Sequence, residues 1–343
     1  MNVPILMYHS IGFPDKRWAN SHLTSPLNEF ESQIKTLRSA GFASITLLDL
    51  FEYRIGNKEI PPQSIVLTFD DGYLDNWIYA YPILKKYGFK GTIFISPEFV
   101  APSQETRTNL LSSRAESTEE KSKLMQLGFL SWAEMRIMEQ EQVMDIQSHT
   151  MTHTFYPISP KVIDYRQSNG SGKSSKYVWM DWNKHVDSKY NYFEMNFAPP
   201  SQEPVYEFEE AITARRFFPE SGQYETEEEY EERLRYEIIE SKKIIEKELN
   251  KKVNFLCWPR GKYNEISLEI AKEAGYLSTA YGSRDIGKEN TPQTDPSRFK
   301  RIWISGITYK GTKHRLSGTL MLLNIRFFNL FDKVVLRWRK KQT

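Results

Sequence analysis

The 343-residue sequence predicts an α/β protein built around parallel strands. Short runs of apolar and β-branched residues alternate with amphipathic segments, and glycines mark many of the links between them. The run at residues 64–69 is typical of a buried strand, and Asp70, Asp71 and Gly72 follow it directly. Because such strands end at one rim of a parallel sheet or barrel, we expect the two carboxylates to lie in a cleft.

Strand-like and helical segments alternate along most of the chain. Apolar runs predict strands or their continuations at residues 3–8, 42–50, 64–69, 92–96, 143–147, 253–257, 279–281 and 299–304. Helical spacing, with glycine or capping residues at the ends, predicts helices at residues 26–40, 80–86, 132–140, 227–250 and 266–274. We therefore assign residues 1–305 to one α/β domain.

Two stretches interrupt this alternation. Residues 101–127 are polar and charged, and they predict an excursion or a loop. Residues 155–225 are too long for an ordinary connection and too aromatic for a disordered linker, which predicts an inserted subdomain or lid. In this insertion, Tyr177, Trp179 and Trp182 form either a platform on which sugar rings stack or the small core of the insertion, and we favour the core.

A basic amphipathic tail, residues 306–343, follows the domain. Its apolar residues have helical spacing, and they are Leu320, Leu323, Phe327, Leu330 and Val334. The tail closes with Arg337-Trp-Arg-Lys-Lys341, so one interpretation is an interfacial helix that makes peripheral membrane contact through residues 316–341. The other interpretation is a helix that docks on the α/β domain or on a second subunit.

Composition limits the class of protein. With 39% hydrophobic and 26% charged residues, the chain is ordinary for a soluble globular protein. Its net charge of +2 gives no electrostatic reason to expect nucleic acid. A single cysteine, Cys257, excludes an intrachain disulfide and a cysteine-based zinc cluster. Residues 1–9 lack signal-peptide features and no run of about 18 apolar residues occurs, so we expect a cytoplasmic protein, at the membrane face if the tail binds lipid.

Two histidines follow another buried strand, in the segment His149-Thr-Met-Thr-His153. Imidazoles at this spacing can reach one metal ion, and one aspartate beside them would complete three protein ligands. Three ligands and an open position are typical of catalytic zinc, although the same set also holds non-haem iron. The second, adjacent aspartate favours a hydrolase, because a hydrolase needs a base that takes a proton from water.

Three segments in this order resemble the motifs of the polysaccharide deacetylase family, also known as the NodB homology or carbohydrate esterase 4 family. They are Thr68-Phe-Asp-Asp-Gly-Tyr73, Ser148-His-Thr-Met-Thr-His153 and Trp258-Pro-Arg-Gly-Lys-Tyr-Asn264. The segment Leu6-Met-Tyr-His-Ser-Ile11 is similar to the branch that contains the poly-N-acetylglucosamine deacetylases. The resemblance covers about residues 3–305. It implies a distorted (β/α) barrel and metal-dependent removal of acetyl from an N-acetylated sugar of a glycan or glycan precursor, with Zn²⁺ as the expected metal.

The resemblance also implies roles for the motif residues. Asp70 resembles the catalytic base, and Asp71, His149 and His153 resemble the metal ligands. The family takes an N–H for the developing oxyanion from its Pro-x-Gly segment, here near Arg260, whose side chain is also a candidate for contact with the substrate. The other motif residues that we expect to bind substrate are Tyr73, Trp258, Pro259 and Gly261.

The sequence departs from the family pattern in two places. The third motif commonly carries an upstream arginine, which residues 255–258 do not supply. The Leu-x-His motif, which gives many members their general acid, has no clear counterpart, and Arg301-Ile-Trp-Ile304 stands near its expected place. His9, at a strand end, is our candidate for the acid or for a sugar contact, against a structural role. A glycan-binding protein without turnover and a hydrolase of a non-sugar amide are the alternative functions.

Overall fold

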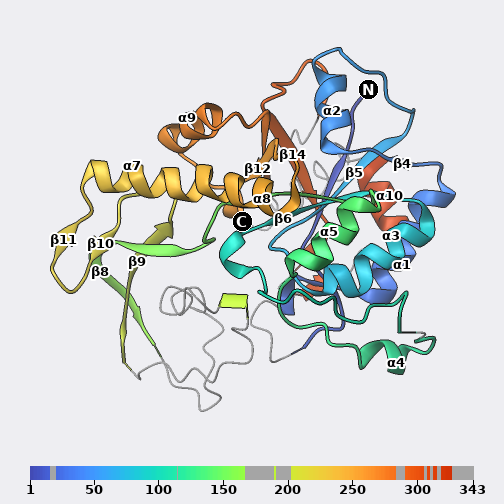
Figure 1. The fold of residues 1–343 in the computed structure, drawn as a ribbon, viewed down its shortest axis with the longest axis horizontal. Coiled ribbons are helices and arrows are strands. Elements are labelled where there is room, and N and C mark those ends of the chain that lie inside the picture. Colours follow the sequence, from blue (N-terminus) through green and yellow to red (C-terminus); the bar gives the residue numbers. More distant parts are fainter. Residues whose placement is uncertain are drawn as a thin grey trace.

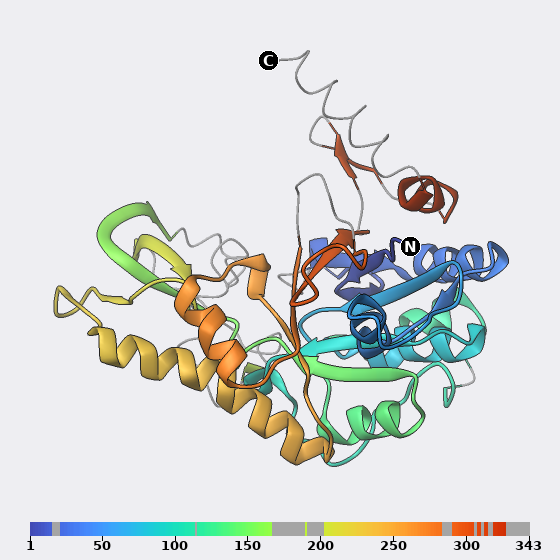
Figure 2. The same cartoon turned by 90° about the horizontal axis from the view of Figure 1, so that it is seen from above.

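The computed structural model describes residues 1–15, 21–113, 115–166, 189–190, 202–282, 290–304, 307–309, 312–314 and 318–326. Figure 1 shows strands at the centre of the larger part of the molecule, with helices around them. Figure 2 shows a second group of strands and the start of a long helix that project to one side.

Seven parallel strands close into a barrel, as expected for the NodB-type fold. In order around the barrel they are β1 (Ile5–Tyr8), β14 (Arg298–Trp303), β13 (Ser278–Gly282), β12 (Phe255–Cys257), β7 (Met144–Ser148), β6 (Gly91–Ile95) and β5 (Ser64–Phe69). The ring closes because β1 pairs on both sides, with Leu6 opposite Leu67 of β5 and Ile302 of β14. A short strand, β4 (Ala43–Ser44), pairs with the first residues of β5.

Strand alternation divides the core into two clusters. One set of side chains packs between the strands and the surrounding helices, and Leu6, Leu67 and Ile302 belong to it. The opposite set forms a second cluster with helix α2 (Leu47–Arg54), and it contains Ile5, Val66, Phe94, Phe255, Cys257, Ala280 and Phe299. Because successive residues of a strand point to opposite faces, this second set fills the barrel interior.

The helices follow the expected alternation. They are α1 (Leu27–Ser39), α2, α3 (Tyr81–Tyr87), α5 (Trp132–Gln140), α7 (Glu227–Arg235), α8 (Ser241–Leu249) and α9 (Glu265–Glu273). A π-helical turn, Asn76–Ala80, precedes α3, and another, Tyr236–Glu240, joins α7 to α8. Single 3₁₀ turns lie at Ser21–Leu23, Pro97–Phe99 and Pro259–Gly261.

The prediction of a strand and its continuation over residues 42–50 is wrong beyond Ser44. Helix α2 begins directly after Thr46, whose hydroxyl accepts a hydrogen bond from the Asp49 N–H at 3.0 Å. Asp49 in turn accepts a hydrogen bond from the Thr46 N–H at 2.9 Å. This reciprocal capping starts a helix inside a run that composition alone favours as a strand.

The two segments that interrupt the alternation, residues 101–127 and 155–225, contribute no strand to the barrel in their described parts. The first contains α4 (Thr118–Ser122), and Arg107 fastens it to the buried Glu134 of α5 at 2.6 Å. The second contains an antiparallel hairpin of β8 (Phe155–Tyr165) and β9 (Pro204–Glu210), followed by β10 (Phe217–Phe218) and β11 (Gln223–Tyr224). These strands and α7 form the projection of Figure 2. Tyr177, Trp179 and Trp182 lie outside the described residues.

Helix α10 (Gly318–Arg326) docks on α1. Met321 is fully buried, and its sulfur lies 3.9 Å from the Tyr8 hydroxyl. Leu320 and Leu323 remain 42% and 40% exposed. An antiparallel pair, β15 (Ile307–Tyr309) and β16 (Thr312–His314), precedes α10. None of the helices in the described ranges has the length and apolar character needed to span a bilayer, and the tail beyond residue 326 lies outside those ranges.

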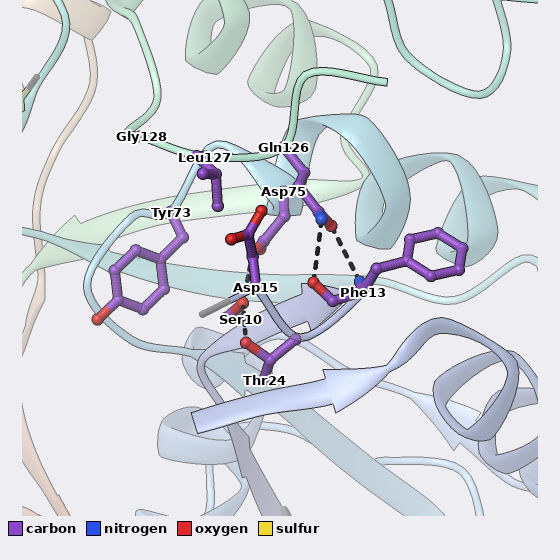
Figure 3. Close-up of a pocket in the computed structure, with 9 residues that line it drawn as sticks. All are labelled: Ser10, Phe13, Asp15, Thr24, Tyr73, Asp75, Gln126, Leu127 and Gly128. Atoms are coloured by element: carbon purple, nitrogen blue, oxygen red, sulfur yellow. Dashed lines mark hydrogen bonds between the residues drawn. The ribbon is translucent and has the colours of Figure 1, made fainter. Parts of the chain in front are cut away.

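A small pocket lies between the chain that follows β1 and the chain that follows β5 (Figure 3). Strand β2 (Ser10–Gly12) continues from β1 and pairs in parallel with β3 (Thr24–Pro26). The buried Asp75 accepts hydrogen bonds from the Ser10 hydroxyl at 2.5 Å and from the Ile11 N–H at 3.0 Å. Asn76 donates to the main-chain oxygen of His9 at 2.9 Å. These contacts fix the backbone just after β1, where His9 lies.

Candidate active site

Asp70 continues the inward-facing series of β5. Val66 and Thr68 precede it at two-residue spacing, so the pleat of the strand directs its side chain into the mouth of the barrel. The side chain is almost fully buried, and the Asp70 N–H donates to the Tyr8 oxygen of the neighbouring strand at 3.0 Å. The strand thus places a carboxylate in an enclosed position at its carboxyl end.

Arg301 forms a two-pronged ion pair with Asp70. One guanidinium nitrogen lies 2.5 Å from Oδ1 and the other lies 2.8 Å from Oδ2. Arg301 is itself 1% exposed, and it also donates to the Cys257 sulfur at 2.9 Å. Burial alone would raise the pKa of Asp70, but the charge and hydrogen bonds of Arg301 outweigh it and lower this pKa below its ordinary value.

Asp71 points elsewhere because the backbone turns at this residue. Its φ is +74° and that of Gly72 is +66°, so two successive residues are left-handed. A Cβ atom on Gly72 would lie 2.8 Å from the Ile95 side chain, which explains the glycine. The turn separates the two carboxylates that the sequence places side by side.

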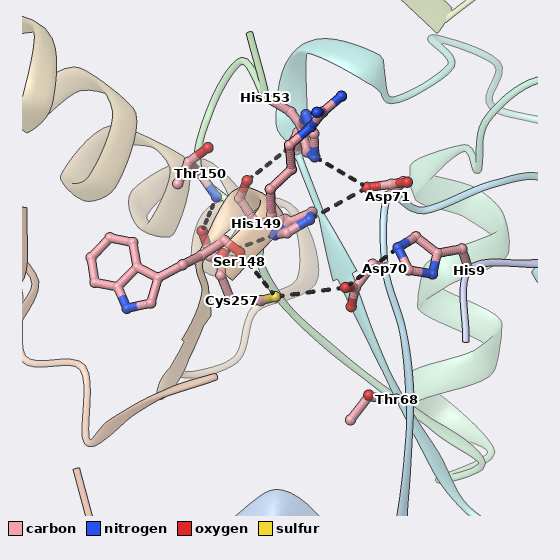
Figure 4. A network of polar contacts seen from close by, with 12 residues as sticks. His9, Thr68, Asp70, Asp71, Ser148, His149, Thr150, His153 and Cys257 are labelled. Carbon is pink, nitrogen blue, oxygen red and sulfur yellow. Dashed lines mark hydrogen bonds and ion pairs between the residues drawn. The ribbon is translucent and has the colours of Figure 1, made fainter. Parts of the chain in front are cut away.

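Two histidines approach the Asp71 carboxylate. His149 follows β7, and its Nε2 lies 3.3 Å from Asp71 Oδ1, while the Nε2 of His153 lies 3.5 Å from the same oxygen. Figure 4 shows the three side chains pointing toward one another. One ligand atom from each residue falls within 4.8 Å of the others.

This donor set fits a divalent metal ion. The His149 Nδ1 lies 2.8 Å from the main-chain oxygen of Cys257, and a carbonyl oxygen only accepts, so Nδ1 carries the hydrogen. The Nε2 atom of the neutral ring therefore directs a lone pair toward the carboxylate of Asp71. A cation between these groups would satisfy both, and an imidazole oriented by a carbonyl is the usual arrangement of a metal ligand.

Burial and the neighbouring charges act in opposite directions on the pKa values of these three residues. Burial favours the neutral acid, yet the close contact with His149 and the charge of His153 hold the pKa of Asp71 far below its ordinary value. Burial also opposes an imidazolium at His149, but Cys257 and Asp71 outweigh it and raise the pKa of His149 well above its ordinary value. At His153 burial dominates and lowers the pKa to about 4.

His9 lies on the other side of Asp70. Its Nε2 is 3.8 Å from Asp70 Oδ2, and its ring packs against that of Trp303 with 5.0 Å between the ring centres. Burial lowers the pKa of His9, although the charges of Asp70 and Asp71 act in the opposite direction. The structure thus brings His9 to the rim of the barrel, as expected.

The Pro-x-Gly segment forms one wall beside these residues. Arg260 has a φ of +51°, its side chain is more than half exposed, and its Nε lies 3.5 Å from the buried Glu210 of β9. The guanidinium also lies 4.5 Å from the centre of the Phe155 ring. A Cβ atom on Gly261 would lie 2.9 Å from the main-chain oxygen of Gly282, so this glycine permits close packing against β13.

Three of the four expected substrate-binding residues are buried. Tyr73 packs on Phe129 with 5.4 Å between the ring centres, and Trp258 stacks on Tyr263 at the same distance. Pro259 is buried as well. Their side chains therefore support the walls of the site, and any contact of these residues with a substrate has to come from the main chain.

Comparison with known proteins identifies the family. The polysaccharide deacetylase family profile matches residues 57–196 and 220–278, which together are more than half of the chain. The protein belongs to the polysaccharide deacetylase family. Both matched ranges contain residues of the site just described.

Similar proteins carry related names. YxkH of Bacillus subtilis, named for the same family, is 25% identical over 83% of this chain and 68% of its own length. The poly-β-1,6-N-acetyl-D-glucosamine N-deacetylase of Escherichia coli K12 is 24% identical over 79% of this chain, but the match spans only 32% of that protein. The solved structure of a de-N-acetylase from Aggregatibacter actinomycetemcomitans has the same fold, with a TM-score of 0.59, 18% identity and coverage of 91% of this chain and 98% of that one.

Sequence reasoning missed the role of Arg301. The family pattern places an arginine before the third motif, on the strand that is β12 here, whereas this chain supplies one from β14. The signal was present as the alternation of Phe299, Arg301 and Trp303, which share the inward face of a strand. A charged residue at such a position needs a buried partner of opposite sign, and Asp70 is that partner.

Proposed function

We propose that this protein is a metal-dependent hydrolase that removes the acetyl group from an N-acetylated sugar. The observation that carries the proposal is the division of two adjacent carboxylates between two tasks. Asp71 faces two histidine Nε2 atoms, whereas Asp70 is held by Arg301. His149 belongs to both groups, since a ligand atom of His149 also lies within 4.8 Å of an oxygen of Asp70.

Asp71, His149 and His153 would hold the metal, and we expect Zn²⁺ because two imidazoles and one carboxylate with an open position suit it. When bound, the metal supplies a Lewis acid that polarises the acetyl carbonyl and makes a water molecule more acidic. Asp70 would take a proton from the attacking water, and Arg301 keeps Asp70 ionised for this task.

Residues at the rim of the barrel would supply the general acid, the oxyanion donor and the contacts with the sugar. His9 lies next to Asp70 and, once protonated, would donate a proton to the leaving amine, or it would contact the sugar. The main chain near Arg260 would donate to the oxyanion, and the exposed Arg260 side chain would bind sugar hydroxyl or anionic groups. The activity for which the Escherichia coli relative is named supports an N-acetylated glucosamine polymer as the substrate to test first.

Replacement of Asp70 by asparagine tests the proposal. Asp70→Asn should keep one metal ion per chain and lower acetate release from N-acetylglucosamine oligomers by about 10²–10⁴-fold, the usual contribution of a general base. Metal content, circular dichroism and acetate release should be measured on the same preparation. Asp49→Asn, in the capping box of α2, is the matched control and should retain activity.

Three other results would argue against this function. Full activity of Asp70→Asn would remove the base role. A wild-type chain that binds the oligomers but releases no acetate would favour the glycan-binding alternative. Acetate release from simple amides, but from no sugar, would favour hydrolysis of a non-sugar amide.

Peripheral membrane contact through residues 316–341, at the cytoplasmic face, remains a separate proposal. Support comes from the exposed Leu320 and Leu323 and from the basic end of the sequence. Because Met321 is buried in the core, the truncation should stop at residue 326. Equal flotation of the full chain and residues 1–326 with anionic liposomes would refute membrane contact through the basic end of the sequence.

A further inference from the structure

The loop between the two histidines has a strained backbone. It runs from β7 to β8, and both Thr150 and His153 have positive φ values, of 65° and 43°. Neither residue is a glycine, so these conformations persist only where the surrounding structure enforces them. His153 therefore depends on contacts outside the loop to keep its side chain directed at Asp71.

One buried carboxylate makes several of these contacts. Glu237 is 1% exposed, and its Oε2 accepts hydrogen bonds from the N–H groups of Met151 and Thr152, each at 3.0 Å. Its Oε1 accepts a hydrogen bond from the Thr152 hydroxyl. A single side chain thus satisfies three donors of the two residues that immediately precede His153.

The same helical face also holds the other end of the loop. Ser241, four residues after Glu237, lies 3.0 Å from the hydroxyl of Ser148, and this hydroxyl accepts a hydrogen bond from the Thr150 N–H at 3.3 Å. Residues four apart on a helix are neighbours. Glu237 lies in the π-helical turn Tyr236–Glu240, a local irregularity that is frequent near functional sites.

We propose that Glu237 is a positioning residue that holds His153 in the orientation of a metal ligand. The inference rests on the proposed metal site and adds to it a residue outside the family motifs. If Glu237 acted on stability alone, its loss would lower the stability of the chain and leave the affinity and spectrum of the bound metal unchanged. A positioning role requires that the affinity and the ligand field of the metal change as well.

The test compares metal binding by Glu237→Ala, Glu237→Gln and the wild type, all as full-length chains. Glu237→Ala should weaken Zn²⁺ binding by about 10–100-fold in competition with a chromophoric chelator, the usual effect of losing a partner that orients a ligand. It should also change the visible absorption spectrum of the Co²⁺ form. Hydrogen exchange of the Met151 and Thr152 amides in the metal-free chain should be faster. Glu237→Gln keeps an acceptor oxygen and should restore most of the affinity.

Glu246→Ala is the matched control. Glu246 lies on α8, and its carboxylate also accepts a main-chain hydrogen bond, from Val253 at 3.0 Å, but it does not touch the histidine loop. Its removal should leave the Co²⁺ spectrum and Zn²⁺ affinity unchanged. If Glu237→Ala does not fold, Thr152→Val, which removes one donor from the loop, must change affinity and spectrum in the same direction.

The outcomes separate this inference from the proposed function. A wild-type chain that binds neither Zn²⁺ nor Co²⁺ would overturn the metal site and the inference with it. A wild-type chain that binds metal, together with folded Glu237 and Thr152 variants of unchanged affinity and spectrum, would overturn the inference alone.

Discussion

At the scale of single residues, the site depends on one buried ion pair. Asp70 and Arg301 are both almost fully buried, and two parallel hydrogen bonds join them. Arginine suits this place because its planar fork matches a carboxylate, whereas lysine offers a point charge. The pair keeps a carboxylate ionised where burial would otherwise protonate it, which is the state that a general base requires.

Substitution of Arg301 should therefore change the pH dependence of the reaction. In Arg301→Leu the pKa of Asp70 should rise, so the acid limb of the kcat/KM profile for acetate release should move to higher pH. The folded chain should also lose about 3–5 kcal/mol of stability, because a buried charge is left without its partner. Arg301→Lys keeps the charge and should show a smaller displacement of the same sign.

Arg298→Leu is the control for this prediction. Arg298 lies on the same strand but is partly exposed, with its Nε 3.7 Å from Asp295. The acid limb of the kcat/KM profile of Arg298→Leu should coincide with that of the wild type. If the acid limbs of both Arg301 variants also coincided with that of the wild type, a group other than Arg301 would set the ionisation of Asp70.

The residues of the site differ in how far the sequence could predict them. Asp70, Asp71, His149 and His153 follow buried strands in short motifs, so the placement of these residues at one rim could be inferred. Arg301 is 231 residues from Asp70 along the chain. Their contact depends on how β14 and β5 both pair with β1, and no local pattern fixes that register.

At the scale of elements, the junction of β1 and β2 is held by a buried acid. Asp75 accepts hydrogen bonds from Ser10, from the Ile11 N–H and, at 2.7 Å, from the Asn76 amide. Burial is the largest influence on this group, and it raises the pKa of Asp75 from an ordinary 3.8 to about 7. The folded chain thus binds a proton at Asp75 more tightly than the unfolded chain does.

This difference predicts how Asp75→Asn should respond to pH. For a pKa raised by folding, the stabilising effect is complete below the unfolded value and disappears as pH rises through the folded value. The wild type should therefore lose stability relative to Asp75→Asn between about pH 4 and pH 7, by a few kcal/mol at about 1.4 kcal/mol per pKa unit. Urea unfolding of both proteins at pH 5 and pH 8 measures this. A pH-independent difference would mean that Asp75 is not protonated in the folded chain.

The elements themselves show where local patterns were sufficient. The helix predicted at residues 132–140 coincides with α5, where Ser131 and Glu134 form a capping box before a helical apolar pattern. The strand predicted at residues 42–50 was wrong beyond Ser44 because the same kind of capping box, formed by Thr46 and Asp49, lies within the apolar run. The π-helical turn at Glu237 was also missed, since a continuous amphipathic pattern covers residues 227–250. The contacts of Glu237 in this turn are with Met151 and Thr152, which lie far away in sequence.

At the scale of the whole molecule, barrel closure assembles the site. His9 follows β1, the two aspartates follow β5, His149 follows β7, and Arg301 lies on β14. These strands span the chain from its first element to β14, and the ring is complete only when β1 pairs with both β5 and β14. The unfolded chain has no comparable arrangement of ligands. Metal that binds at Asp71, His149 and His153 should therefore stabilise the entire barrel.

Metal removal should accordingly lower the melting temperature. A ligand that binds only the folded state at 100 times its dissociation constant adds about 2.7 kcal/mol, which corresponds to several degrees for a chain of this size. Dialysis against a chelator should therefore lower Tm by several degrees, and added Zn²⁺ should restore it. His153→Ala should largely lose this response, whereas His22→Ala, with the histidine of the 3₁₀ turn Ser21–Leu23, should keep it. An equal response of both variants would place the stabilising metal outside the proposed site, because only His153 faces Asp71 among these two residues.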